Sequence, residues 1–134
     1  MQNFVLHPLL QADTTFVADW ALSRLLLMDD ARFPWLVLVP RRAGASELHD
    51  LIHGERLVLM EEIARAGRGL SAFASAKKIN VGALGNIVPQ LHVHVVARKE
   101  SDDAWPGAVW GHGTAIAYEA DARDALITQL RQML

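Results

Sequence analysis

The chain has 134 residues, of which 51% are hydrophobic and 21% charged, with a net charge of −2. This length and balance fit one globular domain with its own core, and we expect residues 1–134 to form it. Thirteen basic residues against fifteen acidic ones, with the basic pairs scattered, argue against a nucleic-acid-binding face. Because the chain has no cysteine, it has no disulfides, thiolate metal ligands or thiol nucleophiles.

The sequence shows no signal for a membrane or for export. No apolar run is long enough to span a bilayer. The first residues, Met1 to Phe4, lack the basic start and the apolar core of a signal peptide. We therefore expect a cytoplasmic protein that does not bind membranes.

The first half of the chain predicts short strands followed by a long helix. Strands are expected at residues 16–20 and 23–28, with a helix through this stretch as the alternative, and a fully buried strand at 36–39. Turn residues at 29–34 separate the second and third strands. Apolar residues at helical spacing predict a helix over about 55–77, although Gly67 and Gly69 weaken its middle.

The second half predicts two strands, an aromatic loop and a helix. Strands are expected at 79–83 and 88–97, joined by a turn at 84–86. Residues 105–110 form an aromatic loop, which either packs on the core or a dimer partner or closes over a base. An amphipathic helix follows at 121–134. This order predicts an α+β fold on a mostly antiparallel sheet of about five strands.

The strand expected at 88–97 carries the candidate site. Its strict alternation predicts a half-buried strand with apolar residues on one face. Gln90, His92 and His94 are expected on the other face, with the two imidazoles about 7 Å apart at the backbone. A strand that only packs a sheet does not need such a polar row. A His-x-His pair on a strand can also bind zinc, so spacing alone leaves a metal site as an alternative. His49 and His53 likewise suit either a metal pair or the solvated start of a helix.

This strand resembles the signature of the histidine triad (HIT) family of nucleotide hydrolases and transferases, His-φ-His-φ-His-φ-φ, where φ is apolar. The match is Gln90-Leu91-His92-Val93-His94-Val95-Val96, which departs from the signature only where Gln90 replaces the first His. Residues 36–42, residues 48–51 with the helix after them, and Asn80 with the 85–86 turn resemble further family elements in the same order. The resemblance covers about 14–99 and leaves 100–134 as a C-terminal extension of a HIT-like domain.

The resemblance implies a reaction and a role for each member of the polar row. His92 matches the nucleophile, which attacks an α-phosphorus and forms a nucleotidyl-histidine that water cleaves. His94 matches the residue that bonds the scissile phosphate and assists the leaving group. Gln90 replaces a residue that mainly orients the nucleophile, and its amide can hydrogen-bond but cannot change charge. The implied substrates are dinucleoside polyphosphates or nucleoside phosphoramidates.

The resemblance also assigns substrate-binding residues. Asn86 stands on the turn where the family places donors to phosphate oxygens, Asn80 matches a pocket position often held by a carboxamide, and Gly85 would let the backbone approach the phosphate. Asp29 or its neighbour Asp30 would accept from ribose hydroxyls. Trp35 falls where many members carry a further His, which is a second departure from the family pattern.

Partners and cofactors follow from the same resemblance. It implies a homodimer in which two sheets join into one and the long helices pack alongside each other. It implies no protein-bound metal and is compatible with a magnesium ion bound to the substrate. Two other functions are kept open, namely a HIT-fold nucleotide sensor with little turnover and a metal enzyme that uses the His-x-His pair.

Overall fold

Five strands and three α-helices form the fold in the computed structural model, which describes residues 3–134. Met1 and Gln2, which entered the signal-peptide argument, lie outside the described residues. In chain order the elements are α1 (Pro8–Asp13), β1 (Thr14–Asp19), β2 (Ser23–Met28), β3 (Trp35–Pro40), a 3₁₀ turn η1 (Leu48–Asp50), α2 (His53–Ala74), β4 (Lys78–Gly82), β5 (Val93–Arg98) and α3 (Ala120–Met133).

The strands form one antiparallel sheet in the order β1-β2-β3-β5-β4. The prediction of an α+β fold on an antiparallel sheet of about five strands is therefore confirmed. Strand β3 lies at the centre, and all six of its residues are buried, as its continuous apolar run predicted. Strands β1 and β4 form the two edges.

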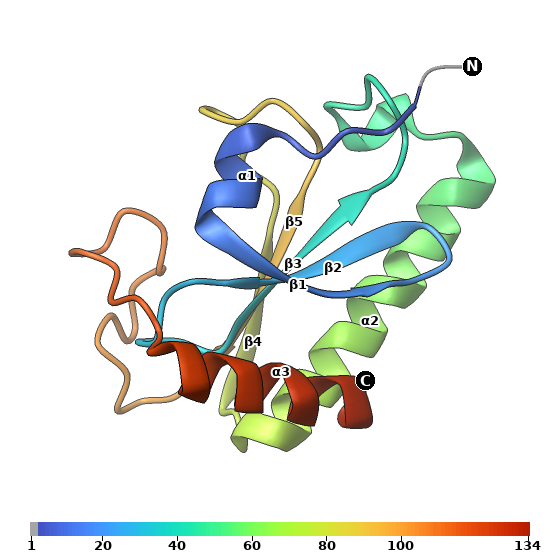
Figure 1. Ribbon diagram of the computed structural model, residues 1–134. Helices are drawn as coiled ribbons and strands as arrows, with labels where there is room; N and C mark the ends of the chain where they lie inside the picture. Colours follow the sequence, from blue (N-terminus) through green and yellow to red (C-terminus); the bar gives the residue numbers. More distant parts are fainter. Residues whose placement is uncertain (1–2) are drawn as a thin grey trace.

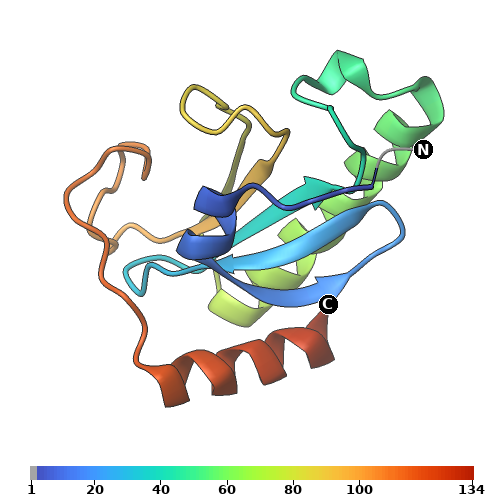
Figure 2. The same ribbon diagram turned by 45° about the horizontal axis from the view of Figure 1, so that its top comes forward.

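Both faces of the sheet are covered, as Figures 1 and 2 show from two directions. Helices α2 and α3 cover one face, over an apolar cluster that includes Leu25, Leu27, Leu36, Leu38, Ala66, Leu70, Val95, Ile127 and Leu130. Helix α1 and the segment of residues 99–119 contribute to the other face, where the cluster includes Leu10, Leu26, Phe33, Trp35, Val37, Val96 and Val109. Strand β5 is buried along its whole length, so the prediction of a half-buried strand is wrong.

The last strand is also shorter than predicted. It begins at Val93 rather than at 88, so Gln90 and His92 precede it. The sheet pairing ends here on both sides, because Leu38 is the last residue of β3 that pairs with β5, at Val93, and Gly82 is the last residue of β4, opposite His94. The N–H of Leu91 bonds instead to the carbonyl of Ala45 (3.0 Å) in a loop.

The other predicted elements agree with the structure to within three residues, and the strand at 23–28 agrees at both ends. Helix α2 passes through Gly67 and Gly69 without a break, and Gly69 lies at a close contact. A Cβ on Gly69 would collide with the side chain of Leu134, which closes the end of α3. The helix ends at Ala74 and is capped by Ser75, whose φ of 50° is left-handed. Among residues 3–134 no helix is long and apolar enough to cross a membrane.

Candidate active site

His92 and His94 meet at the start of β5, on the face covered by α1 and the 99–119 segment. Their ring centroids are 4.9 Å apart, and the two residues are 7% and 6% exposed. His94 pairs across the sheet with Val37 of β3 and with Gly82 of β4. His94 is thus held by three neighbouring strands, whereas His92 lies directly before β5.

The hydrogen-bond partners of the two imidazoles assign opposite tautomers. Nδ1 of His92 lies 2.7 Å from the carbonyl oxygen of Gln90, and because a carbonyl only accepts, this nitrogen carries the hydrogen. Nδ1 of His94 accepts from the indole N–H of Trp35 at 2.9 Å. The neutral His92 ring therefore has its lone pair on Nε2, whereas the neutral His94 ring has its hydrogen there.

His94 is held in its uncharged form. Burial, together with a smaller effect of repulsion from a charged His92, lowers the pKa of His94 from 6.5 to about 4. At neutral pH His94 is a hydrogen-bond donor without a net charge.

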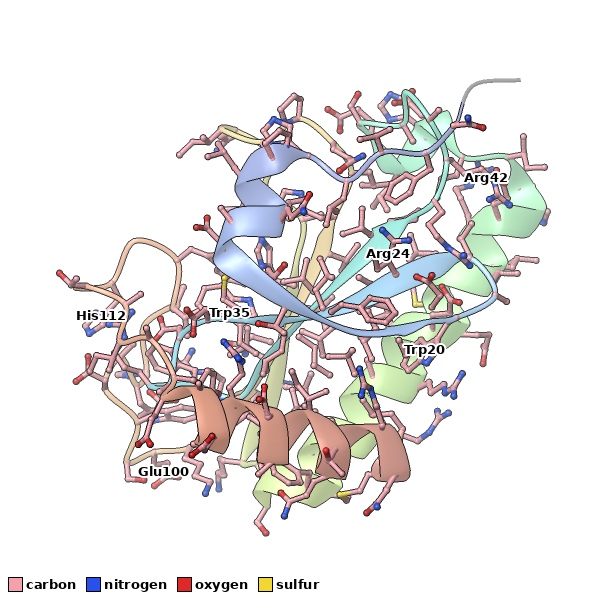
Figure 3. The ribbon with its side chains drawn as sticks, viewed as in Figure 1. Trp20, Arg24, Trp35, Arg42, Glu100 and His112 are labelled. Carbon is pink, nitrogen blue, oxygen red and sulfur yellow. The ribbon has the colours of Figure 1, made fainter. Side chains whose placement is uncertain are left out.

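Aromatic rings enclose His94. Trp35 and Trp110 pack edge-on against it, with centroid distances of 5.5 and 5.6 Å. Figure 3 labels Trp35 within the molecule and His112 on the outer part of the 99–119 segment. Gly82 leaves room for Trp110, because a Cβ there would lie 2.9 Å from the Trp110 ring. The 105–110 loop thus packs on the core and on the histidine pair, which is the first of the two predicted roles.

The amide of Gln90 forms hydrogen bonds to the N-terminal segment and to neither histidine. Its side-chain Nε2 donates to the carbonyl of Val5 (2.8 Å), and its Oε1 accepts from the N–H of His7 (2.8 Å). Gln90 and His92 both precede β5, so the alternation of the strand does not set the direction of the Gln90 side chain. Its backbone carbonyl orients His92, while its amide attaches the N-terminal segment to the site.

Asn80 is part of a buried ion-pair network. Its Oδ1 accepts from Arg98 at 2.8 Å, and Arg98, which is 1% exposed, also binds both carboxylate oxygens of Asp102 at 2.7 and 3.0 Å. Hydrogen bonds from Arg98, followed by several backbone N–H groups, lower the pKa of Asp102 to about 2 in spite of burial. The bond to Arg98 leaves the amide NH₂ of Asn80 as the group that can donate to a ligand.

Two cavities flank the histidine pair. The first has a volume of about 340 Å³ and is lined by Ala12, Asp13, Met28, Asp29, Asp30, Arg32, Trp35, Val109, Gly111, His112, Gly113 and Ala115. The second has a volume of about 190 Å³ and is lined by Ser46, Glu47, Leu48, His49, Ala83, Leu84, Gly85, Gln90, Leu91 and His92. Contacts run from the first cavity through Trp35 and His94 to His92 in the second.

Some of the site residues predicted from the sequence line these cavities, and others do not. His92, Gln90 and Gly85 line the second, and Gly85 adopts a left-handed φ of 72° that favours glycine. Asn86 is exposed on the same turn and lines neither cavity.

Asp29 lines the first cavity, and its Oδ1 also accepts from the N–H of Tyr118 at 2.9 Å. The neighbouring Asp30 is 2% exposed and paired with Arg32 at 2.8 Å, which makes Asp29 the more accessible of the two.

Sequence reasoning missed the contributions of Trp110, Gly82 and His49. No local pattern links the first two to β5, because only the sheet register brings Gly82 opposite His94. The pairing of His49 with His53 as metal ligands finds no support, since no group of three or more metal-binding side chains is found within the described residues. His49 instead lines the second cavity with His92.

The antiparallel sheet, the long helix on one face and the histidine pair at the start of β5 define an α+β domain of the histidine triad type. A sequence model described as the HIT domain matches residues 10–101. The chain belongs to the HIT family.

Solved structures of histidine triad proteins superimpose on nearly the whole chain. One from Bradyrhizobium japonicum is 43% identical, with 98% of each chain covered and a TM-score of 0.96. One from Sinorhizobium meliloti 1021 is 40% identical, with 98% of this chain and 97% of the other covered and a TM-score of 0.96. One from Marinobacter aquaeolei VT8 is 37% identical, with coverages of 99% and 97% and a TM-score of 0.97. These matches extend into the segment beyond residue 101. No curated protein matches the chain.

Proposed function

We propose that this protein hydrolyses or transfers nucleotides at the α-phosphate, through a covalent nucleotidyl adduct on His92. The observation that carries the proposal is the 2.7 Å contact between Nδ1 of His92 and the Gln90 carbonyl, which leaves the lone pair on Nε2. A neutral imidazole nitrogen with a free lone pair is a nucleophile. Members of the HIT family commonly act as nucleotide hydrolases or transferases, and His92 lines a cavity in which a phosphate would meet it.

In this proposal the first cavity takes the nucleoside. Its volume of about 340 Å³ suits a small ligand. Met28 and Trp35 provide apolar surface for a base, and Asp29 provides a carboxylate for the ribose hydroxyls. One Asp29 oxygen already accepts from Tyr118, but a carboxylate has lone pairs for further donors.

The phosphates would lie along the turn after β4. Gly85 lets the backbone come close to a ligand, and the amides of Asn86 and Asn80 can donate to phosphate oxygens. The second cavity, at about 190 Å³, suits the leaving group. Dinucleoside polyphosphates and nucleoside phosphoramidates are the proposed substrates. No protein-bound metal takes part in this proposal, and magnesium would arrive with the nucleotide.

The test is turnover of diadenosine tetraphosphate by the wild type and by His92→Ala. We expect the variant to lose activity by on the order of 10³-fold or more, because it lacks the nucleophile. AMP binding should survive, since the proposed nucleoside cavity is unchanged. Unaltered turnover by the variant would refute the proposal.

A second candidate is a nucleotide sensor with little turnover. The observation in its favour is that both polar ends of the Gln90 amide are engaged by the N-terminal segment, so this residue does not occupy the place of a third catalytic imidazole. A sensor would bind AMP tightly and would convert neither substrate class at a measurable rate.

We also propose that the protein is a homodimer that joins its sheets at the β4 edge, with the α2 helices alongside. Val81, Leu84 and Ile87, at and after β4, are 49%, 47% and 84% exposed, and α2 exposes Leu57 and Met60. An edge strand with uncovered apolar side chains is a ready site for strand pairing. Light scattering after gel filtration should report a dimer, and Val81→Asp should shift it to a monomer. A monomeric wild type would contradict the proposal.

A further inference from the structure

The indole of Trp35 is hydrogen-bonded to the imidazole of His94 inside the protein. Its N–H donates to Nδ1 over 2.9 Å, and the two residues are 7% and 6% exposed. Trp35 is fixed on the central strand, where its ring packs edge-on against Phe33 and Trp110 at centroid distances of 6.5 Å each. The bond is therefore built into the site rather than formed between mobile surface groups.

This bond determines which nitrogen of His94 carries the hydrogen. An indole N–H can only donate, so Nδ1 must offer its lone pair, and the hydrogen of the neutral ring lies on Nε2. A second hydrogen on Nδ1 would place two N–H groups head to head. The rings of Trp35, His92 and Trp110 pack on His94, and Val37 and Gly82 pair with it across the sheet. Of these, His92 is the ionisable one, and its positive charge would oppose another on His94.

We propose that Trp35 is a positioning residue that keeps His94 as an uncharged Nε2–H donor and so selects nucleotide anhydrides over nucleotides with an amine leaving group. This inference rests on the proposed function, because it concerns the leaving group of the reaction at His92. There the Nε2 lone pair of His92 bonds to the α-phosphorus, while the bond to the leaving phosphate oxygen breaks and its electron pair goes to that oxygen. Water then bonds to phosphorus, the P–N pair returns to His92, and one proton passes to solvent.

The two classes of leaving group differ in their need for a proton. A phosphate departs as an anion near neutral pH, since its second pKa is about 6, and the Nε2–H of His94 can hydrogen-bond to it. An amine must receive a proton on its nitrogen before it leaves phosphorus. His94 could give that proton only from a doubly protonated ring, which the Trp35 bond opposes, or by becoming an imidazolate, which is far too basic. Phosphoramidates should therefore react slowly.

The first test compares kcat/KM for diadenosine tetraphosphate with that for adenosine 5′-phosphoramidate, two substrates that share the same nucleoside. We expect the wild type to prefer the anhydride by about 100-fold, the size of a general-acid contribution. Trp35→Phe keeps an aromatic ring but removes the N–H, and the preference should fall about 10-fold. Trp20→Phe is the matched control, since Trp20 is a buried indole in the cluster under α2 and α3. An equal preference in the wild type and in Trp35→Phe would overturn the inference.

A second measurement needs neither turnover nor a folded variant. Nitrogen–proton NMR correlation on the imidazole rings of the free wild type should find the hydrogen of His94 on Nε2. A hydrogen on Nδ1 would overturn the inference. Turnover by His92→Ala distinguishes a failure of the proposed function from a failure of the Trp35 inference. If this variant still cleaves the anhydride, the proposed function fails; if it is inactive and the Trp35→Phe preference is unchanged, the Trp35 inference alone fails.

Discussion

The rings of His92 and His94 stand 4.9 Å apart with their hydrogens on opposite nitrogens. A backbone carbonyl fixes the first ring and an indole N–H fixes the second, so neither assignment depends on solvent. Nε2 of His92 therefore has a free lone pair, whereas Nε2 of His94 has a hydrogen to donate, although the two residues belong to the same short sequence motif. The chemical difference between them comes from their partners, Gln90 and Trp35.

The buried neutral state of His94 predicts a loss of stability in acid. Between about pH 6.5 and about pH 4 the unfolded chain binds a proton at this ring that the folded chain does not. The free energy of unfolding should therefore fall as the pH falls, by up to about 1.4 kcal/mol per pH unit from this group. His94→Asn, which keeps an acceptor for Trp35, should show a shallower slope in urea unfolding at pH 7, 6 and 5. His53→Asn, at the exposed start of α2, is the control and should keep the pH dependence of the wild type. If the stability of His53→Asn and that of His94→Asn depend equally on pH, the account is contradicted.

We predict that the missing side chain of Gly82 leaves the space that the Trp110 ring needs to pack against His94. In Gly82→Ala the new methyl group would lie 2.9 Å from the indole, so the ring must move away from His94. Overpacking of this kind costs about 1–3 kcal/mol, and calorimetry should find a lower Tm. Gly54→Ala adds the same methyl group in open space on α2 and should be nearly neutral. Equal melting temperatures for the two variants would show that Trp110 is not tightly packed.

The Arg98 network should be a main contributor to stability. Arg98→Met leaves the carboxylate of Asp102 without its cation in a site where the two side chains are 1% and 9% exposed. Removing one partner of such a pair costs about 3 kcal/mol or more, which urea unfolding measures directly. Lys99→Met, at the exposed next position, is the control. A midpoint for Arg98→Met that matches this control would rule out a structural role for the pair.

Gln90 should hold the N-terminal segment in place. Gln90→Glu keeps an acceptor for His7 but loses the donor to the Val5 carbonyl, so one of two cross-chain bonds is replaced by a repulsive contact. Limited proteolysis should then cut before α1 several-fold faster than in the wild type. Gln129→Glu makes the same charge change on the exposed face of α3. If both variants resist proteolysis equally, the amide of Gln90 has another role.

The sequence was most informative where periodicity was strong and least where tertiary partners decide. The strand at 23–28 and the buried run of β3 were predicted almost to the residue, because apolar patterns reflect burial directly. The start of β5 was wrong by five residues, since alternation continues through 88–92 while the neighbouring strands offer no further partners. The alternation of polar and apolar residues within one segment does not show where its pairing with neighbouring strands ends.

The site, too, could be predicted where a local pattern marks it but not where distant residues contribute. His92 and His94 could be identified from one short segment, and the structure brings them together. The partner that sets the tautomer of His94 is Trp35, 59 positions away, and no local pattern links the two. Gln90 was correctly singled out as unusual, but its bonds go to residues more than 80 positions earlier, which only the folded chain shows.

If His92 is the nucleophile, it carries the nucleotide as a covalent adduct during turnover, and mass spectrometry can detect this adduct. The wild type would be mixed with diadenosine tetraphosphate, quenched within seconds under mildly basic conditions that preserve phosphoramidate bonds, and digested. We predict one adenylyl group on the peptide that contains His92, and none in His92→Ala. Turnover by the wild type without an adduct on this peptide, or an adduct that persists in His92→Ala, would contradict the account.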